Sequence, residues 1–146
     1  MKELKVTCSA FKSNGLIPVK YTCDGDNVNP PLKMEGMPKE AKSLALIVDD
    51  PDAPMGTWVH WVVWNIAVTE KIEENSIPGV EGLNSSGKHS YHGPCPPSGT
   101  HRYFFKVYAL DNKLDISTNS NKENVERAME GHILAKGEII GLYSRR

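Results

Sequence analysis

Three stretches of the chain have the hydrophobic patterns of β-strands that pack in a core. Residues 43–48 form a short continuous apolar run, as expected of a central strand covered on both faces. Residues 58–66 and 103–110 are rich in the aromatic and β-branched side chains typical of strands. Within residues 58–66, alternation predicts one face with Trp58, His60, Val62 and Trp64 and the other with Val59, Trp61, Val63 and Asn65.

The segments around these strands predict shorter strands and one long loop. Residues 4–11 and 17–22 are interpreted as a hairpin around a turn at Ser13-Asn14-Gly15. Residues 67–97 contain many prolines, glycines and polar turn residues, so we interpret them as one long irregular segment. Such a loop in a small domain is typical of a functional region.

One helix is predicted in the C-terminal half. Ser120-Asn-Lys-Glu123 matches a capping box. The apolar stripe that follows consists of Val125, Ala128, Met129, His132 and Ile133, with His132 expected as a packed, hydrogen-bonded residue. Gly137 is expected to end the helix, and residues 138–143 predict a last strand. Many short strands and one helix favour a mostly β fold, an antiparallel β-sandwich, in a single domain over residues 1–146.

Composition limits the classes of function. The 146 residues carry 17 basic and 18 acidic side chains, so nucleic acid is not an expected partner. No apolar run approaches the ~18 residues that span a bilayer, and no signal peptide is recognisable, so we expect a cytoplasmic protein without a transmembrane segment. We favour Cys8, Cys23 and Cys95 as buried reduced residues over a Cys23–Cys95 bridge or a reactive thiol, because a reducing compartment disfavours disulfides.

Residues 49–65 place carboxylates, prolines and a histidine at the edge of the predicted core. Side chains here and further on that could bind zinc are Asp50, His60, His101, His89 and His92. Their spacing does not match a known zinc motif, so surface histidines are favoured over a metal site. A nucleophilic hydrolase lacks support, since no G-x-S-x-G elbow occurs and Ser98 and Cys95 have no evident base.

An anion site would use the same residues. Imidazole N–H groups and backbone amides donate hydrogen bonds to phosphoryl oxygens. Asp50 then has a role as the group that raises the pKa of His60 or His101, and Trp58 could form an apolar wall. Asp52 and Arg102 are expected to form a structural ion pair.

The chain must reverse tightly between Asp50 and His60 if the two side chains are to meet. Proline tolerates a cis peptide bond at a cost of about 0.5–1 kcal/mol. We therefore predict a cis bond between Ala53 and Pro54.

Several motifs together resemble the phosphatidylethanolamine-binding protein family, also called Raf kinase inhibitor protein-like. They are Asp50-Pro-Asp-Ala-Pro54, Trp58-Val-His60, Gly93-Pro-Cys-Pro-Pro97, Gly99 and His101-Arg-Tyr103. Further stretches are similar to its bacterial and archaeal branch, namely Thr22-Cys-Asp-Gly25, Asn29-Pro-Pro-Leu32, Ala128-Met-Glu-Gly-His132 and Gly137-Glu138.

This resemblance implies a β-sandwich with a small anion pocket, no cofactor and no catalytic activity. Carried over residue by residue, the pocket would be lined by Asp50, Pro54, Trp58, His60, Gly93, Pro94, His101 and Tyr103. The implied ligands are phosphate, phosphoryl-bearing small molecules and phospholipid head groups. The alternative is an inhibitor that acts on a serine protease or kinase through its surface. His92 either adds a third imidazole at the pocket mouth or points to solvent, and solvent is slightly favoured. The oligomeric state stays open, with a homodimer among the candidates.

Overall fold

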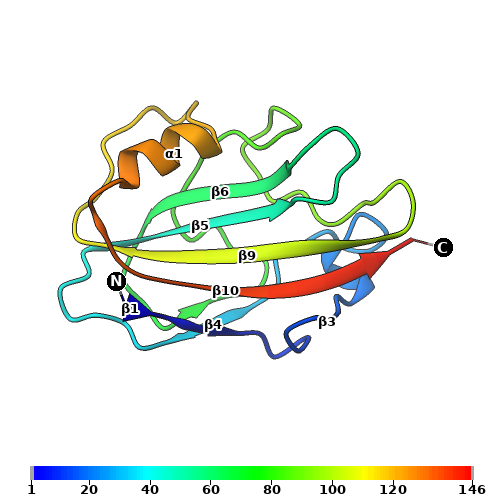
Figure 1. Cartoon of the computed structure of the whole chain (residues 1–146), viewed down its shortest axis with the longest axis horizontal. Coiled ribbons are helices and arrows are strands. Elements are labelled where there is room, and N and C mark those ends of the chain that lie inside the picture. The colour runs from blue at the N-terminus through cyan, green and yellow to red at the C-terminus, as the bar shows by residue number, and fades with distance from the viewer. Residues whose placement is uncertain (1, 146) are drawn as a thin grey trace.

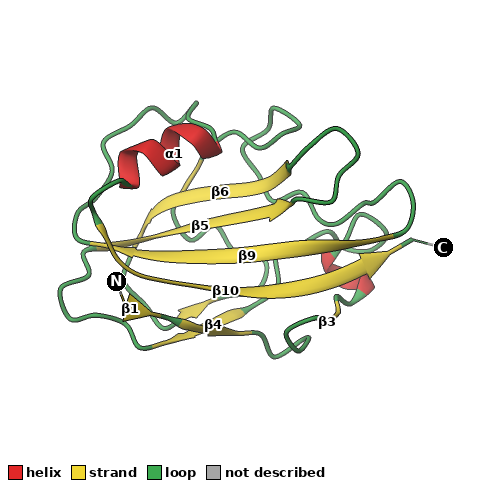
Figure 2. Cartoon of the chain, in the orientation of Figure 1, coloured by secondary structure: helices red, strands yellow, loops and turns green. Residues whose placement is uncertain are grey.

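The computed structural model describes residues 2–145 and contains two β-sheets with one α-helix (Figure 1, Figure 2). The larger sheet contains β1 (Lys2–Glu3), β10 (Ile133–Ser144), β9 (Thr100–Leu110), β5 (Ser43–Asp50), β6 (Trp58–Ile66) and β8 (Val80–Glu81) in this order, with β3 (Gly15–Leu16) also paired to β10. The smaller sheet has the order β2 (Lys5–Thr7), β4 (Leu32–Glu35) and β7 (Lys71–Ile72). The helical elements are the 3-10 turn η1 (Val19–Tyr21) and α1 (Lys122–Met129).

The two sheets enclose the main core, and α1 covers the outer face of the larger sheet. Leu4, Met34 and Ile72 pack from the smaller sheet and its flank against Leu46 and Phe105 of the larger one. On the other side, Val125 and Met129 of α1 pack against a second group of buried residues, Ala45, Ile47, Val59, Val62, Trp64, Leu110 and Leu114. The predicted mostly β sandwich with one helix is confirmed.

β5 is the central strand, as its apolar composition predicts. All residues of Ser43–Asp50 are buried, and β5 pairs antiparallel with β6 on one side and β9 on the other. Because both faces are covered, the strand can be apolar throughout until it ends on two carboxylates, Asp49 and Asp50. These two face opposite sides of the sheet.

Asp49 joins the helix to the sheet. Asp49 is 1% exposed, and its carboxylate forms ion pairs at 3.0 Å with Nζ of Lys106 on β9 and with Nζ of Lys122 at the start of α1. The two lysines supply the positive charge without which a buried carboxylate would be costly. The sequence did not distinguish Asp49 from other strand residues.

A bulge in β6 changes the predicted alternation. Val48 pairs with Trp61 but Asp49 pairs with Val59, so His60 is an extra residue between two ladder positions. Beyond it, Val62 and Trp64 lie with Val59 on the helix side, whereas Trp61 and Val63 face the main core. The prediction that Val62 and Trp64 share a face with His60 is therefore wrong.

The predicted N-terminal hairpin is also wrong. The first strand stops at Thr7, and the expected second strand is a 3-10 turn, Val19–Tyr21, that follows Pro18. Gly15–Leu16 pairs in parallel with Gly141 and Leu142 of β10, far away in sequence, and β1 pairs with the same strand. β10 is thus covered along part of its outer edge by two short N-terminal strands.

The helix begins one residue later than predicted and ends earlier. Asn121 is its N-cap, and Asn124 completes the capping box in place of Ser120 and Glu123. The helix ends at Met129, so His132 lies outside it, half-exposed, with Nδ1 2.8 Å from Asp111. Within residues 2–145, no helix is long and apolar enough to cross a membrane. The segment 67–97 is mostly irregular, as predicted, apart from β7 and β8.

Candidate functional site

A cavity of about 300 Å³ lies where β5 ends and where β6 and β9 begin. The residues that line it are Asp50, Ala53, Pro54, Trp58, His60, His92, Cys95, Pro96, Pro97, His101 and Tyr103. Larger hollows of about 550 and 590 Å³ occur elsewhere on the surface, but no histidine lines either of them. Three histidines line the smaller cavity, which makes it the candidate site.

Asp50 and His101 form a buried pair at the base of the cavity. Asp50 is the last residue of β5 and His101 the second of β9, and Nδ1 of His101 lies 2.6 Å from Oδ2 of Asp50. The other carboxylate oxygen, Oδ1, accepts the backbone N–H of Asp52 at 2.8 Å. Both oxygens of Asp50 are therefore engaged, and the imidazole of His101 is held in one orientation.

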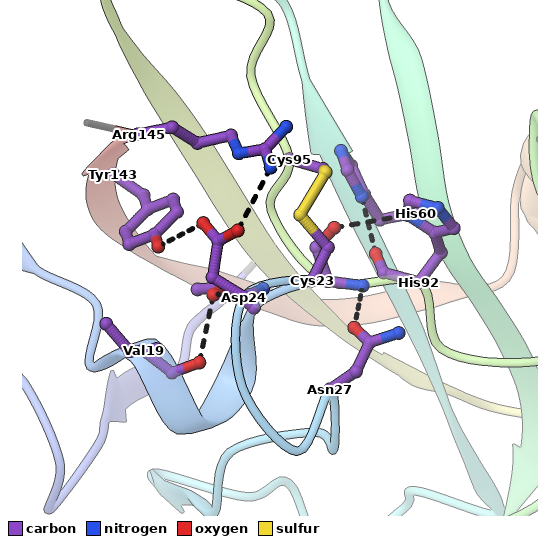
Figure 3. The surroundings of a disulfide bond; sticks show 11 residues. Val19, Cys23, Asp24, Asn27, His60, His92, Cys95, Tyr143 and Arg145 are labelled. Atoms are coloured by element: carbon purple, nitrogen blue, oxygen red, sulfur yellow. Dashed lines mark hydrogen bonds and ion pairs between the residues drawn. A yellow bond between two sulfur atoms is a disulfide. The ribbon is translucent and has the colours of Figure 1, made fainter.

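His60 occupies the bulge of β6 and is bonded to the segment before β9. Its Nδ1 lies 2.5 Å from the backbone carbonyl of His92, and the backbone N–H of His92 donates to the carbonyl of His60 at 3.0 Å (Figure 3). Burial lowers the pKa of His60 to about 4, although the His92 carbonyl and the carboxylate of Asp50 oppose this shift. Asp50 thus acts on His60 in the predicted direction, but burial outweighs this charge and the net shift of the His60 pKa is downward.

Tyr103 lies between the two histidines and has a buried hydroxyl without a partner. Its ring is edge-on to His60 at 5.3 Å and stacked on His101 at 6.4 Å between centroids. Within residues 2–145, the buried side-chain polar atoms without a hydrogen bond are the Tyr103 hydroxyl and Oδ1 of Asn112. Burial raises the pKa of Tyr103, so the hydroxyl stays a potential donor. An unsatisfied buried hydroxyl beside a cavity is a natural contact for a ligand.

Asp52 and Arg102 form an ion pair at the mouth of the cavity. Nε and Nη2 of Arg102 donate to the two carboxylate oxygens at 2.9 and 2.8 Å, and the backbone N–H of Arg102 adds a third bond at 2.9 Å. These hydrogen bonds lower the pKa of Asp52 to about 2. The structure brings together the two residues that the sequence paired, and the contact fixes the acidic turn against β9.

The peptide bond between Ala53 and Pro54 is trans. No cis peptide bond occurs in residues 2–145, so the predicted cis-proline is wrong. Two successive turns over residues 51–56 reverse the chain instead, and the N–H of Gly56 donates to the carbonyl of Ala53 at 3.2 Å. Gly56 has a φ of 104°, which an L side chain rarely adopts, and this left-handed position removes the need for a cis bond.

Cys23 and Cys95 form a disulfide, contrary to the favoured interpretation as reduced residues. Their Cα atoms are 5.5 Å apart at a sequence separation of 72. The bond links the segment after η1 to the proline-rich segment before β9 (Figure 3), and Cys95 lines the cavity. Cys8 remains a free, half-buried thiol.

Gly93 and Pro94 do not line the cavity but hold its wall in place. The N–H of Gly93 donates to Oδ1 of Asn27 at 2.8 Å, and the carbonyl of Pro94 accepts the N–H of Cys23 at 3.1 Å. A Cβ at position 93 would lie 2.4 Å from the carbonyl oxygen of Tyr21, so this approach requires glycine. The residues that follow, Cys95 to Pro97, are thereby turned towards the cavity.

His92 is the functional candidate that sequence reasoning misplaced. It was expected in solvent, but its backbone pairing with His60 brings it to the cavity, with the two rings 5.7 Å apart. Only the position of the bulge could have indicated this contact. No group of three or more His, Cys, Asp and Glu side chains in the described part of the chain is arranged to hold a metal ion.

Comparisons with known proteins found similar sequences and similar structures. The model of the phosphatidylethanolamine-binding protein family matches residues 7–144. A UPF0098 protein from Methanothermobacter thermautotrophicus is 53% identical over 144 residues, covering 93% of this chain and 95% of the relative. A UPF0098 protein from Chlamydia muridarum is 44% identical over 149 residues, covering 97% of this chain and 99% of that relative.

Two crystal structures have the same fold over nearly the whole chain. One is a phosphatidylethanolamine-binding protein homologue from Chlamydia trachomatis, with a TM-score of 0.95, 42% identity and complete coverage of both chains. The other is YbcL from E. coli, described as a member of the mammalian family, with a TM-score of 0.90, 31% identity and 99% coverage of both chains. The chain therefore belongs to the phosphatidylethanolamine-binding protein family.

Proposed function

We propose that this protein binds phosphate or a terminal phosphoryl group in the histidine-lined cavity and does not catalyse a reaction on it. The observation that carries the proposal is the set of unsatisfied polar atoms around one small hollow. Nε2 of His60 and Nε2 of His101 make no hydrogen bond within residues 2–145, and the hydroxyl of Tyr103 is buried without a partner. Apolar walls from Trp58 and Pro54 strengthen polar contacts made there.

The hydroxyl and thiol nucleophiles of serine, threonine and cysteine are absent from the described cavity lining, which supports binding without catalysis. The described residues that line it include no serine, threonine or free cysteine, because the sulfur of Cys95 is bonded to Cys23. Ser98 is outside this set. A carboxylate–imidazole pair such as Asp50–His101 can orient a ligand as well as activate a nucleophile, and here we assign it the first role.

Titration with inorganic phosphate, followed by the imidazole signals in NMR spectra, tests the proposal. His101→Ala should weaken phosphate binding by about 10- to 100-fold, the range expected for a lost hydrogen bond to a charged group. His132→Ala is the matched control, because His132 is also bonded to an aspartate but precedes β10 at the opposite end of the sheet. Equal phosphate affinity of His101→Ala and wild type would overturn the proposal.

A second candidate function is inhibition of a serine protease or kinase through the surface. Met55 is 99% exposed and Trp58 39% exposed beside the cavity mouth, and exposed apolar side chains at such a rim favour a protein partner. The candidate ranks second because Met55 lies in a tight turn and not in an extended, substrate-like segment. Loss of protease inhibition in Met55→Ala, with phosphate binding retained, would support it. No inhibition by the wild type across proteases and kinases would exclude it.

The cytoplasmic location and the homodimer stay predictions. Intracellular disulfides are rare outside some thermophiles, so the Cys23–Cys95 bond makes the redox state of the protein in cells a direct test of location. Alkylation of free thiols in intact cells should label Cys8 alone where the bond exists. Sedimentation at several concentrations would measure the oligomeric state.

A further inference from the structure

The hydrogen bonds of two histidines fix which ring nitrogen carries a proton. Nδ1 of His60 faces the carbonyl oxygen of His92 at 2.5 Å, and Nδ1 of His101 faces the carboxylate of Asp50 at 2.6 Å. Carbonyl and carboxylate oxygens only accept hydrogen bonds, so each Nδ1 must be the donor. In a neutral ring the other nitrogen, Nε2, is then a bare acceptor.

Nε2 of both rings is open to the cavity. Neither Nε2 atom makes a hydrogen bond in the described residues. A buried nitrogen without a hydrogen bond would be among the buried unpartnered atoms, which are the Tyr103 hydroxyl and Oδ1 of Asn112, so both nitrogens must have accessible surface. Both rings line the same hollow, and the Tyr103 ring contacts each of them. A ligand in the cavity therefore meets these two nitrogens.

His60 is neutral at physiological pH. The groups around it in the cavity are Asp50 from β5, His101 and Tyr103 from β9, and His92 from the preceding segment, and Asp49 acts on it by charge from the other side of the sheet. The two carboxylates favour the charged ring, but desolvation is the largest effect and lowers the pKa of His60 to about 4. Asp52 and Arg102 neutralise one another at the mouth. Near pH 7, Nε2 of His60 thus presents a lone pair to the ligand.

A fully deprotonated oxyanion would place its own lone pairs against this nitrogen. A hydroxyl on phosphorus would instead donate to it, while another oxygen accepts from the Tyr103 hydroxyl. We propose that the cavity selects phosphoryl groups that keep an acidic proton, with the P–OH donating to Nε2 of His60. This inference rests on the proposed phosphoryl-binding function.

The ligand class that follows is the phosphomonoester or phosphate itself. A phosphodiester carries one negative charge but no P–OH, and a sulfate monoester has the same shape and charge without the proton. The phosphoryl group should therefore be terminal in its molecule, as on a phosphorylated hydroxyl group. An internal phosphodiester, as in an intact diacyl phospholipid, should be rejected.

Three small ligands distinguish the effect of the P–OH proton from the effect of the negative charge. Methyl phosphate in its monoanionic form, methyl sulfate and dimethyl phosphate all carry a single charge, and only the first has a hydroxyl to donate. Methyl sulfate has no proton to donate, so it should bind only to protein in which His60 is protonated. Above the His60 pKa of about 4, that fraction falls about tenfold for each pH unit, and the apparent affinity for methyl sulfate falls with it. Methyl phosphate should bind as the monoanion, which keeps the P–OH. With a second pKa of about 6, only about a tenth of it is monoanion at pH 7, so its apparent affinity falls by about tenfold.

Calorimetric titration of the wild-type protein should thus show that methyl phosphate binds more tightly than methyl sulfate, by about tenfold at pH 5 and about a hundredfold at pH 7. Dimethyl phosphate should behave like methyl sulfate. Equal affinities for all three probes would overturn this inference and leave the proposed function standing. No binding of any probe, methyl phosphate included, would overturn the proposed function itself.

His60→Phe tests the assigned acceptor directly. The variant keeps a planar ring but has no Nε2, so the preference for methyl phosphate over methyl sulfate should disappear. If the variant does not fold, ¹⁵N NMR of the imidazoles in the wild type gives the same information. Nε2 of His60 should have the signal of an unprotonated nitrogen at pH 7 both free and with methyl phosphate bound, and a protonated signal would overturn the inference.

Discussion

Removing the Cys23–Cys95 disulfide should lower the free energy of unfolding by about 4 kcal/mol. The bond closes a loop with a sequence separation of 72 residues, and the chain-entropy relation gives about 4 kcal/mol for a loop of that length at 25 °C. In this relation the loss arises in the unfolded state, which gains conformations when the link is cut. The folded state should change little.

Other contacts between the two segments that the disulfide links explain why the cavity should keep its shape when the bond is removed. The two linked segments are also held together by three hydrogen bonds that do not involve sulfur, namely Cys23 N–H to the Pro94 carbonyl at 3.1 Å, Gly93 N–H to Asn27 at 2.8 Å and the Tyr91 hydroxyl to the Tyr21 carbonyl at 2.7 Å. Phosphate affinity should therefore change less than about threefold, since the residues that would contact phosphate keep their positions.

Urea denaturation of Cys23→Ala/Cys95→Ala and of the wild type measures the difference at equilibrium. The control is Cys8→Ala, which removes the free thiol and leaves the bond intact. A loss below about 1 kcal/mol in the double variant would contradict the loop-entropy reasoning. A collapse of phosphate affinity in a variant that is still folded would show that the disulfide itself shapes the cavity wall.

Two further substitutions test the support of the site. Gly93→Ala should lower the free energy of unfolding by about 1–3 kcal/mol, because the new Cβ would meet the Tyr21 carbonyl oxygen at 2.4 Å and Asn27 Oδ1 at 2.5 Å, and urea denaturation equal to wild type would refute this. Arg102→Ala should lower the free energy of unfolding above about pH 4 and have little effect near pH 2. The pKa of Asp52 is about 2 in the folded protein and 3.8 unperturbed, so its contribution to stability is complete above about pH 4 and disappears towards pH 2. Urea denaturation across this range should show a difference between wild type and variant that shrinks as the pH falls, and a difference that does not depend on pH would refute this.

The strands that form the centre of the larger sheet were predictable because each contains its own signal. Residues 43–48, 58–66 and 103–110 are apolar or aromatic over most of a strand length, and each became a long strand. The predicted hairpin failed because Gly15–Leu16 pairs with β10, a partner that no local pattern specifies. The capping box was one residue off, since Ser120 and Asn121 are both good N-cap residues and side-chain geometry selected Asn121.

The candidate site was predictable in outline from motifs far apart in sequence. Asp50, His60 and His101 were assigned from the resemblance, and the sheet brings them together at one end of three neighbouring strands. His92 was favoured in solvent over the pocket mouth, because it reaches the cavity through a backbone pairing at a bulge, and a bulge leaves no mark in an apolar strand. The Cys23–Cys95 bond was the disfavoured alternative, because the expected reducing compartment argued against it and nothing in the sequence near either cysteine shows that the two are neighbours.

The two carboxylates at the end of β5 should prevent that strand from changing its length during evolution. Asp49 and Asp50 are neighbours in sequence, yet one pairs with the lysines under the helix and the other with His101 at the cavity. Inserting or deleting a single residue within 43–48 would exchange the faces of both carboxylates. Each would lose its partner at once, and two buried charges would be left uncompensated. We expect natural length variation in this family to fall in the loops and to spare this strand.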